Sequence, residues 1–148
     1  MNNKIPPPIV TLISGLAIYF SRNLFPNHNG LLIDVFSPLL LICGIIIIRT
    51  AFLSFKNHQT TINPLNLTKS SSLVNTGIFK YTRNPMYLGM VFLLLSIALK
   101  FNLYGGLIVI LLFFSFITKF QIIPEEKAME KLFGQEFKNY KNTTRRWI

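Results

Sequence analysis

The sequence predicts an all-α integral membrane protein with about four transmembrane helices and a cytoplasmic amphipathic helix at its C-terminus. Its 148 residues are 51% hydrophobic and only 14% charged, whereas soluble domains carry about 25% charged residues. The 14 phenylalanines are more than a water-exposed surface would hold. This composition excludes a soluble enzyme with a polar shell and a disordered basic tail. The length fits a single membrane domain over residues 1–148.

Four apolar stretches predict the transmembrane helices. They cover about residues 8–25, 35–55, 85–101 and 103–123. Crossing the hydrocarbon core takes about 20 helical residues, so the short third stretch is expected to tilt or to lie where the bilayer thins. The first is interpreted as a retained span, because no small-residue cleavage site follows it. A tight turn around residues 100–102 makes the last two spans an antiparallel hairpin.

The distribution of basic residues orients these spans. The net charge is +10, and most Lys and Arg residues lie in the 56–84 loop or after residue 123. The other two connections offer only Arg22 and Lys100. By the positive-inside rule, both termini and the 56–84 loop are expected to face the cytoplasm, in a plasma membrane or a bacterial inner membrane. Anionic membrane lipids account for the positive charge, so no nucleic-acid partner is predicted.

The chain changes character after Pro124. Apolar residues recur there at three- and four-residue spacing, with Lys and Glu between them: Ala128, Met129, Leu132, Phe133, Phe137 and Tyr140. This pattern predicts that the tail, residues 124–148, forms an amphipathic helix along the cytoplasmic surface or under the bundle.

Several kinds of site are disfavoured by where the reactive residues fall. None of the acids lies in the middle of an apolar stretch, which argues against a proton-coupled transporter. The two histidines, His28 and His58, have no partner at metal-ligand spacing, and Cys43 is the single cysteine. No metal site is therefore predicted. The glycines form neither a dinucleotide-binding nor a P-loop pattern.

Two segments hold more polar chemistry than a membrane anchor needs. In residues 77–89, Asn84 and Pro85 suit the start of a helix, and the free N–H groups of such a start can bind an anion. Glu125 and Glu126 follow Pro124, where acids stabilise a helix through its dipole. Each segment has a purely structural interpretation. Together they bring an Arg, an Asn, a Tyr and two carboxylates to neighbouring cytoplasmic helix ends.

These segments resemble the isoprenylcysteine carboxyl methyltransferase family, to which phospholipid N-methyltransferases are related. The resemblance covers roughly residues 77–147. It rests on Arg83-Asn84-Pro85-Met86-Tyr87-Leu88-Gly89, a transmembrane hairpin, Glu125-Glu126, Leu132-Phe133-Gly134, Tyr140 and Arg145-Arg146-Trp147. It implies S-adenosylmethionine as methyl donor, S-adenosylhomocysteine as product, and a lipophilic methyl acceptor that enters from the bilayer.

The resemblance also implies roles for single residues. One wall of the cofactor site would be formed by Asn84, Pro85, Tyr87, Leu88 and Gly89, and the other by Glu125, Glu126 and Tyr140. Arg83, Glu126 and Arg145 are the candidate catalytic residues, with the arginines placed to hold an acceptor carboxylate. Tyr140 and the segment 145–147 are expected to fold back over the pocket.

The sequence departs from the family at Asn84, where many members have His. Asn cannot titrate near neutral pH, so only a positioning role is expected there. A carboxylate acceptor needs no general base, which favours O-methylation of a prenyl-cysteine-like substrate. An N- or S-methyltransferase acting on a lipid amine or small thiol remains an alternative, with Glu125, Glu126 or Tyr87 as base. So does a non-catalytic membrane protein with a basic face that binds lipids or a partner. The oligomeric state is not predicted.

Overall fold

The computed structural model describes residues 5–26, 30–58 and 72–148, and these residues contain helices and no strand. The elements are α1 (Pro7–Phe20), the 3-10 turn η1 (Ser21–Leu24), α2 (Leu31–Asn57), the 3-10 turn η3 (Gly77–Lys80), α3 (Pro85–Phe101), α4 (Leu103–Ile117), the π-turn η4 (Thr118–Ile122) and α5 (Ile123–Thr143). The all-α class is confirmed.

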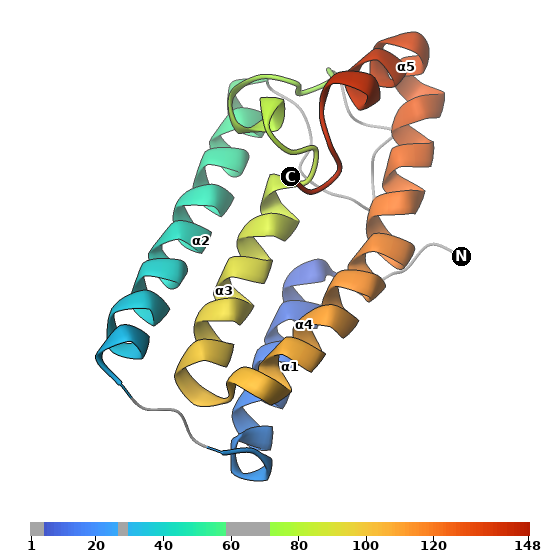
Figure 1. Ribbon diagram of the computed structural model, residues 1–148. Helices are drawn as coiled ribbons and strands as arrows, with labels where there is room; N and C mark the ends of the chain where they lie inside the picture. Colours follow the sequence, from blue (N-terminus) through green and yellow to red (C-terminus); the bar gives the residue numbers. More distant parts are fainter. Residues whose placement is uncertain (1–4, 27–29, 59–71) are drawn as a thin grey trace.

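Helix α3 lies at the centre of the bundle. It packs against α2 on one side and against α1 and α4 on the other (Figure 1). The helices meet over a buried apolar core. Helices α1, α3 and α4 contribute its buried residues, among them Ile18, Leu94, Ala98, Ile110, Phe113 and Ile117. We call α1 to α4 the apolar body. Their outward side chains are largely exposed hydrophobics, which suits a lipid environment.

The contact between α2 and α3 is close because two glycines face each other. A Cβ atom added at Gly89 would lie 2.5 Å from Ile48 Cγ1 and 2.9 Å from the carbonyl oxygen of Gly44. Nearby, the Ser96 hydroxyl donates to the Ser37 carbonyl at 2.7 Å, and the Ser37 hydroxyl donates to the Ser96 carbonyl at 3.1 Å. Small residues that let two backbones approach are typical of helix pairs in membranes.

Within the described residues, two helices are long and apolar enough to cross a membrane by length and composition: Leu31–Asn57 and Leu103–Thr143. Helix α3 has the bounds expected for the third span and is a shorter apolar helix. Helix α1 ends at Phe20, before the expected residue 25, because the chain tightens there into η1. The number of four spans stays a prediction.

The predicted tail helix is present as α5, which begins at Ile123, directly before the expected boundary at Pro124. It is not separate from the preceding helix, because α4 runs through η4 into α5 without a break as far as Gly134, where two helical segments meet at a kink. The ring of a proline clashes with a carbonyl of the preceding turn in a regular α-helix. The wide π-turn directly before Pro124 relieves this clash. The helix bends instead at Gly134, whose φ is +52°, and the chain then turns back toward the start of α3 (Figure 1).

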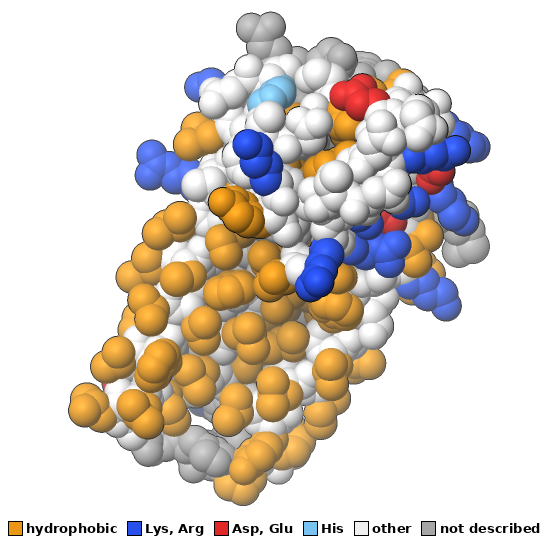
Figure 2. Space-filling view, turned by 45° about the horizontal axis from the view of Figure 1, so that its top comes forward, with side chains coloured by type: hydrophobic (Ala, Val, Ile, Leu, Met, Phe, Trp, Pro, Cys, Tyr) orange, Lys and Arg blue, Asp and Glu red, His pale blue; other side chains and the backbone are white. Residues whose placement is uncertain are grey.

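A second cluster of buried residues lies beyond the apolar body. It joins the end of α2, the segment 73–79 and the far part of α5 through Ala51, Leu73, Val74, Phe79, Phe137 and Tyr140. We call residues 72–84 and 124–148 the polar cap. Figure 2 shows hydrophobic side chains covering the apolar body, while Lys and Arg gather toward the cap. Of the predicted 56–84 loop, residues 59–71 lie outside the described residues.

Candidate active site

The candidate site lies where the first turn of α3, the beginning of α5 and residues 144–147 meet. Pro85 takes the first helical position of α3, as expected from its fixed φ angle. Asn84 precedes it, but its side chain does not cap the helix. Asn84 Nδ2 donates instead to the carbonyl of Arg146 at 2.9 Å. The residue therefore ties the C-terminal segment to the start of α3.

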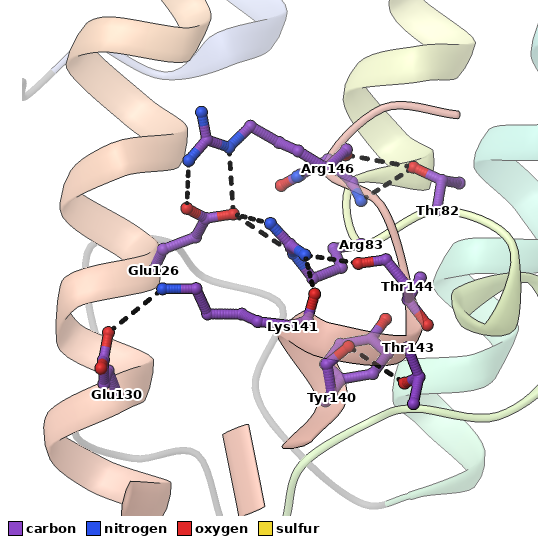
Figure 3. A network of polar contacts seen from close by, with 10 residues as sticks. Thr82, Arg83, Glu126, Glu130, Tyr140, Lys141, Thr143, Thr144 and Arg146 are labelled. Atoms are coloured by element: carbon purple, nitrogen blue, oxygen red, sulfur yellow. Dashed lines mark hydrogen bonds and ion pairs between the residues drawn. The ribbon is translucent and has the colours of Figure 1, made fainter. Parts of the chain in front are cut away.

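Glu126 lies between two guanidinium groups at the centre of the site (Figure 3). Its Oε1 accepts from Arg83 Nη2 at 2.8 Å and from Arg146 Nε at 3.1 Å, and its Oε2 accepts from Arg146 Nη2 at 2.7 Å. Burial raises the pKa of Glu126, but the hydrogen bonds and charges of Arg146 and Arg83 outweigh it, and the net pKa is lowered. Glu126 is therefore ionised at neutral pH.

The Arg83 side chain uses its remaining donors to hold the tail. Its Nη1 donates to the carbonyls of Lys141, at 3.1 Å, and Thr144. Its backbone N–H donates to the carbonyl of Arg145 at 3.0 Å. The Arg83 side chain is only 9% exposed. Arg83 thus lies in the site predicted from the sequence, and its contacts there clamp the C-terminal segment against α3 and α5.

A second polar pair connects α3 to α5. The Tyr87 hydroxyl donates to Glu125 Oε1 at 2.6 Å, which leaves Oε2 of that carboxyl available to another group. Burial raises the pKa of Glu125 to about 7; the hydrogen bond from Tyr87 opposes this rise, and the neighbouring charge of Glu126 adds to it. The two adjacent acids therefore differ, because Glu126 is held ionised by two arginines and Glu125 can gain or lose a proton near neutral pH.

The C-terminal segment contributes Arg146 to this network. The Arg145 side chain is exposed, whereas Arg146 pairs with Glu126. Successive side chains of an extended segment point to opposite sides, so two neighbouring arginines do not both face the site. The sequence ranked Arg145 as the candidate catalytic residue, and only the path of the tail distinguishes the two. The expected fold-back of the segment 145–147 onto the start of α3 is observed.

The other predicted residues have different surroundings. Gly89 faces Gly44 and Ile48 of α2, so its lack of a side chain serves helix packing. Leu88 is half-buried, next to it on α3. The Tyr140 hydroxyl donates to the carbonyl of Phe79 at 2.6 Å and so holds the polar cap together. The structure therefore brings together Arg83, Asn84, Tyr87, Glu125, Glu126 and Arg146.

The donor set of the site is suited to a zwitterionic ligand that also carries a sulfonium. The Glu125 carboxyl and the Tyr87 hydroxyl lie close to each other and can bind cationic or hydroxyl groups. The Arg146 side chain, which is 37% exposed, and the first turn of α3 can bind a carboxylate, since the first N–H groups of a helix have no partner within it. These groups lie at the edge of the apolar body, next to its exposed hydrophobic side chains.

The fold and site are those of a small helical protein with exposed apolar helices and a cluster of paired polar side chains at one end of them. A family model described as phospholipid methyltransferase matches residues 33–136. This match covers most of the chain, so the chain belongs to the phospholipid methyltransferase family. The match spans Arg83 to Glu126 and ends before the tail that carries Arg146. The isoprenylcysteine branch of the sequence resemblance stays a prediction.

One relative is a Haemophilus influenzae protein described as an uncharacterized protein. It is 35% identical to this chain over 63 residues, which are 43% of this chain and the whole of that protein. No solved structure matches the chain.

Proposed function

We propose that this protein is an S-adenosylmethionine-dependent methyltransferase whose active site lies between the start of α3 and the beginning of α5. The observation that supports this most strongly is the pair of polar links between these helices. Tyr87 contacts Glu125, and Arg83 contacts Glu126. All four residues fall within the segment that matches the family model. The acids and the tyrosine that the sequence motifs select are thus assembled at one place.

The residues of the site offer a complementary group for each part of the cofactor. Glu125 Oε2 suits the ammonium or the sulfonium cation, the Tyr87 hydroxyl suits the ribose, and Arg146 or the first turn of α3 suits the carboxylate. Glu126 holds Arg83 and Arg146 in place beside these groups. When bound, S-adenosylmethionine supplies an electrophilic methyl group and leaves as S-adenosylhomocysteine. The protein contributes alignment of the acceptor, since in-line displacement depends strongly on orientation.

The acceptor we propose is a lipid amine. An ammonium group must lose a proton before its nitrogen can form a bond to carbon. Glu126 is fully paired with arginines and ionised, so it is a poor base. Glu125 has a pKa of about 7 and is therefore suited to accept that proton at neutral pH. This reverses the preference for a prenyl-cysteine carboxylate, which rested on the absence of a suitable base at Asn84. The exposed guanidinium of Arg145 is the feature that still suits a carboxylate acceptor.

We also propose that the acceptor enters sideways from the bilayer at the cytoplasmic face. The apolar surface of α1 to α4 and the basic residues around the cap support this orientation. Gln121 Nε2 donates to the carbonyl of Ile5 at 2.9 Å, so the beginning of α1 lies at the level where α4 passes into α5. Both ends of the chain are then on one side of the membrane. The chain would be a multi-pass protein of a plasma membrane or inner membrane.

Transfer of a radiolabelled methyl group tests the proposal. The purified protein is supplied with labelled donor and with phosphatidylethanolamine, a prenyl-cysteine analogue, or the same head groups without chains. We expect label in phosphatidylethanolamine and about a hundredfold slower transfer by Glu125→Gln. The exposed Glu136→Gln is the matched control and should retain the rate of the natural protein.

Each other outcome has a defined meaning. If label appeared in the prenyl-cysteine analogue alone, the acceptor would be a carboxylate and not an amine. Equal label in chained and chainless head groups would contradict sideways entry. Binding of neither cofactor nor acceptor by a folded sample would favour a non-catalytic membrane protein with a basic lipid- or partner-binding face.

A further inference from the structure

Two buried polar atoms beside the candidate site lack a hydrogen-bond partner within the described part of the chain. They are the indole Nε1 of Trp147 and the hydroxyl Oγ1 of Thr118. A buried donor without an acceptor lowers the stability of the folded protein. Buried tryptophans normally find a partner for the indole N–H. The pair therefore calls for a functional explanation.

Both atoms lie on the same side of α4. The Trp147 ring stacks on the Phe114 ring, with centroids 4.3 Å apart and planes at 24°. Thr118 follows Phe114 by four residues, so the two side chains are neighbours on one helix face. Thr118 is also the first residue of the π-turn η4, and π-turns are frequent at functional sites. Phe114 is 39% exposed, so this face borders the outer surface of the apolar body.

The other helical threonines show that Thr118 is exceptional. Thr11 donates to the carbonyl of Pro7 at 3.0 Å, Thr50 to that of Ile47 at 2.9 Å, and Thr143 to that of Tyr140 at 3.1 Å. A helical threonine can thus satisfy its hydroxyl within its own helix, and these three residues do so. Thr118 does not, which leaves its hydroxyl free to bind a group from outside the chain.

We propose that Trp147 Nε1 and Thr118 Oγ1 together bind an ester carbonyl oxygen of a glycerolipid, the lipid that the proposed function would methylate. Two neutral donors in apolar surroundings favour a neutral acceptor over a charged phosphate. The position of Trp147 relative to the charged network also agrees with this assignment. Trp147 directly follows Arg146, whose side chain belongs to the charged network on Glu126. In a glycerolipid, the ester carbonyls likewise lie just below the charged head group.

The test uses Trp147 as its own reporter, because it is the single tryptophan of the chain. In maltoside detergent, the protein is titrated with dioctanoyl phosphatidylethanolamine and with the dioctyl ether analogue, which lacks both ester carbonyls. We expect a saturable change in Trp147 emission, with the ester lipid bound about five- to tenfold more tightly than the ether. Thr118→Val should lower the affinity for the ester lipid to that for the ether lipid.

Thermal stability without lipid separates this role from a structural one. Thr118→Val should leave the melting temperature unchanged or raised, because it removes an unpaired hydroxyl. Thr11→Val, the matched control, should lower the melting temperature slightly and leave lipid binding unchanged, since its hydroxyl is paired within α1. Trp147→Phe keeps a ring on Phe114 and loses the N–H. The stabilisation by ester lipid should then equal that by ether lipid.

Equal affinities for ester and ether lipids in the natural protein would overturn the inference. So would a loss of stability in Thr118→Val as large as that in Thr11→Val. S-adenosylhomocysteine binding is measured on the same samples. Failure of that binding would contradict the proposed function alone, whereas equal ester and ether affinities would contradict the carbonyl site alone.

Discussion

The apolar body and the polar cap are held together by different interactions. The body relies on close helix contacts, such as Gly44 against Gly89, and on an apolar core centred on α3. The cap relies on ion pairs and on hydrogen bonds to carbonyl oxygens, several of which involve Arg83 or Glu126. A helix pair in lipid gains little from the hydrophobic effect, so shape must provide its specificity. In the cap, each buried charge must instead find a partner.

The apolar body and the polar cap therefore contribute to the site in different ways. The body fixes the direction of α3 and of the long helix Leu103–Thr143, so that the start of the first and the middle of the second lie close together. The cap then places polar groups at that point, using a tail that is far from Arg83 in sequence. A change in the body should therefore alter stability with the site contacts kept, whereas a change in the cap should alter both.

The largest effect is expected from Arg83→Met in the cap. It leaves Glu126 with one arginine and removes the donor to the carbonyls of Lys141 and Thr144. Breaking a buried ion pair from one side costs about 3 kcal/mol. Unfolding in mixed micelles measures this loss, with Arg145→Met as the matched control because its side chain is exposed. Similar losses in both variants would show that the clamp formed by Arg83 does not stabilise the cap.

A somewhat smaller effect is expected from Gly89→Ala in the body. The new methyl group would lie 2.5 Å from Ile48 Cγ1, so α2 and α3 must separate. Overpacking of this kind costs about 2 kcal/mol. Gly30→Ala is the control, because a Cβ there would have nothing within 4 Å. If Gly89→Ala were as stable as Gly30→Ala in the same unfolding assay, the close packing of α2 on α3 would not be required.

The pH dependence of stability distinguishes the two acids of the cap. The folded pKa of Glu125 is about 7, above its ordinary value of 4.5. The folded protein therefore keeps a proton that the unfolded chain has lost, and stability should fall as pH rises from about 4.5 to 7. The slope is at most about 1.4 kcal/mol per pH unit. Glu126 has a lowered pKa, so its contribution is lost only below about pH 4.5.

Glu125→Gln imitates the protonated side chain and should remove the fall between pH 4.5 and 7. Melting temperatures of the natural protein and the variant across this range measure the difference. The same slope in both proteins would show that Glu125 does not carry the proton.

The smallest effect is expected from Ser96→Ala in the body. The variant loses the hydrogen bond from the Ser96 hydroxyl to the Ser37 carbonyl, but keeps the bond from the Ser37 hydroxyl to the backbone carbonyl of residue 96. Hydrogen bonds between membrane helices contribute on average about 0.6 kcal/mol. Ser115→Ala on the exposed side of α4 is the control for the change in residue type. A loss above that expected from Arg83→Met would reverse the proposed division between body and cap.

The sequence predicts the body better than the cap, and the reason is physical. Hydropathy locates the apolar helices, and the Asn84-Pro85 pair locates the start of α3, because these signals are local. The continuation of α4 through Pro124 depends on η4, which no residue pattern in the sequence indicates. The bend at Gly134 is likewise visible only in the backbone.

The sequence predicts which residues form the site better than it predicts which of them contact each other. The motif brings Arg83, Tyr87, Glu125 and Glu126 to attention, and the structure places them together. It cannot show that Arg146 faces Glu126 while Arg145 faces outward, since this depends on the path of a tail held by long-range contacts. The different environments of Glu125 and Glu126 also depend on contacts between segments that are far apart in the sequence.

Binding of S-adenosylhomocysteine tests the central claim most directly. At 100 times its dissociation constant, the ligand should stabilise the folded protein by about 2.7 kcal/mol. Tyr87→Phe, which loses the hydroxyl that contacts Glu125, should reduce this gain, whereas Tyr81→Phe, with a side chain 78% exposed, should not. An unchanged melting temperature at millimolar ligand in a folded sample, or an equal gain in both variants, would contradict a cofactor site between α3 and α5.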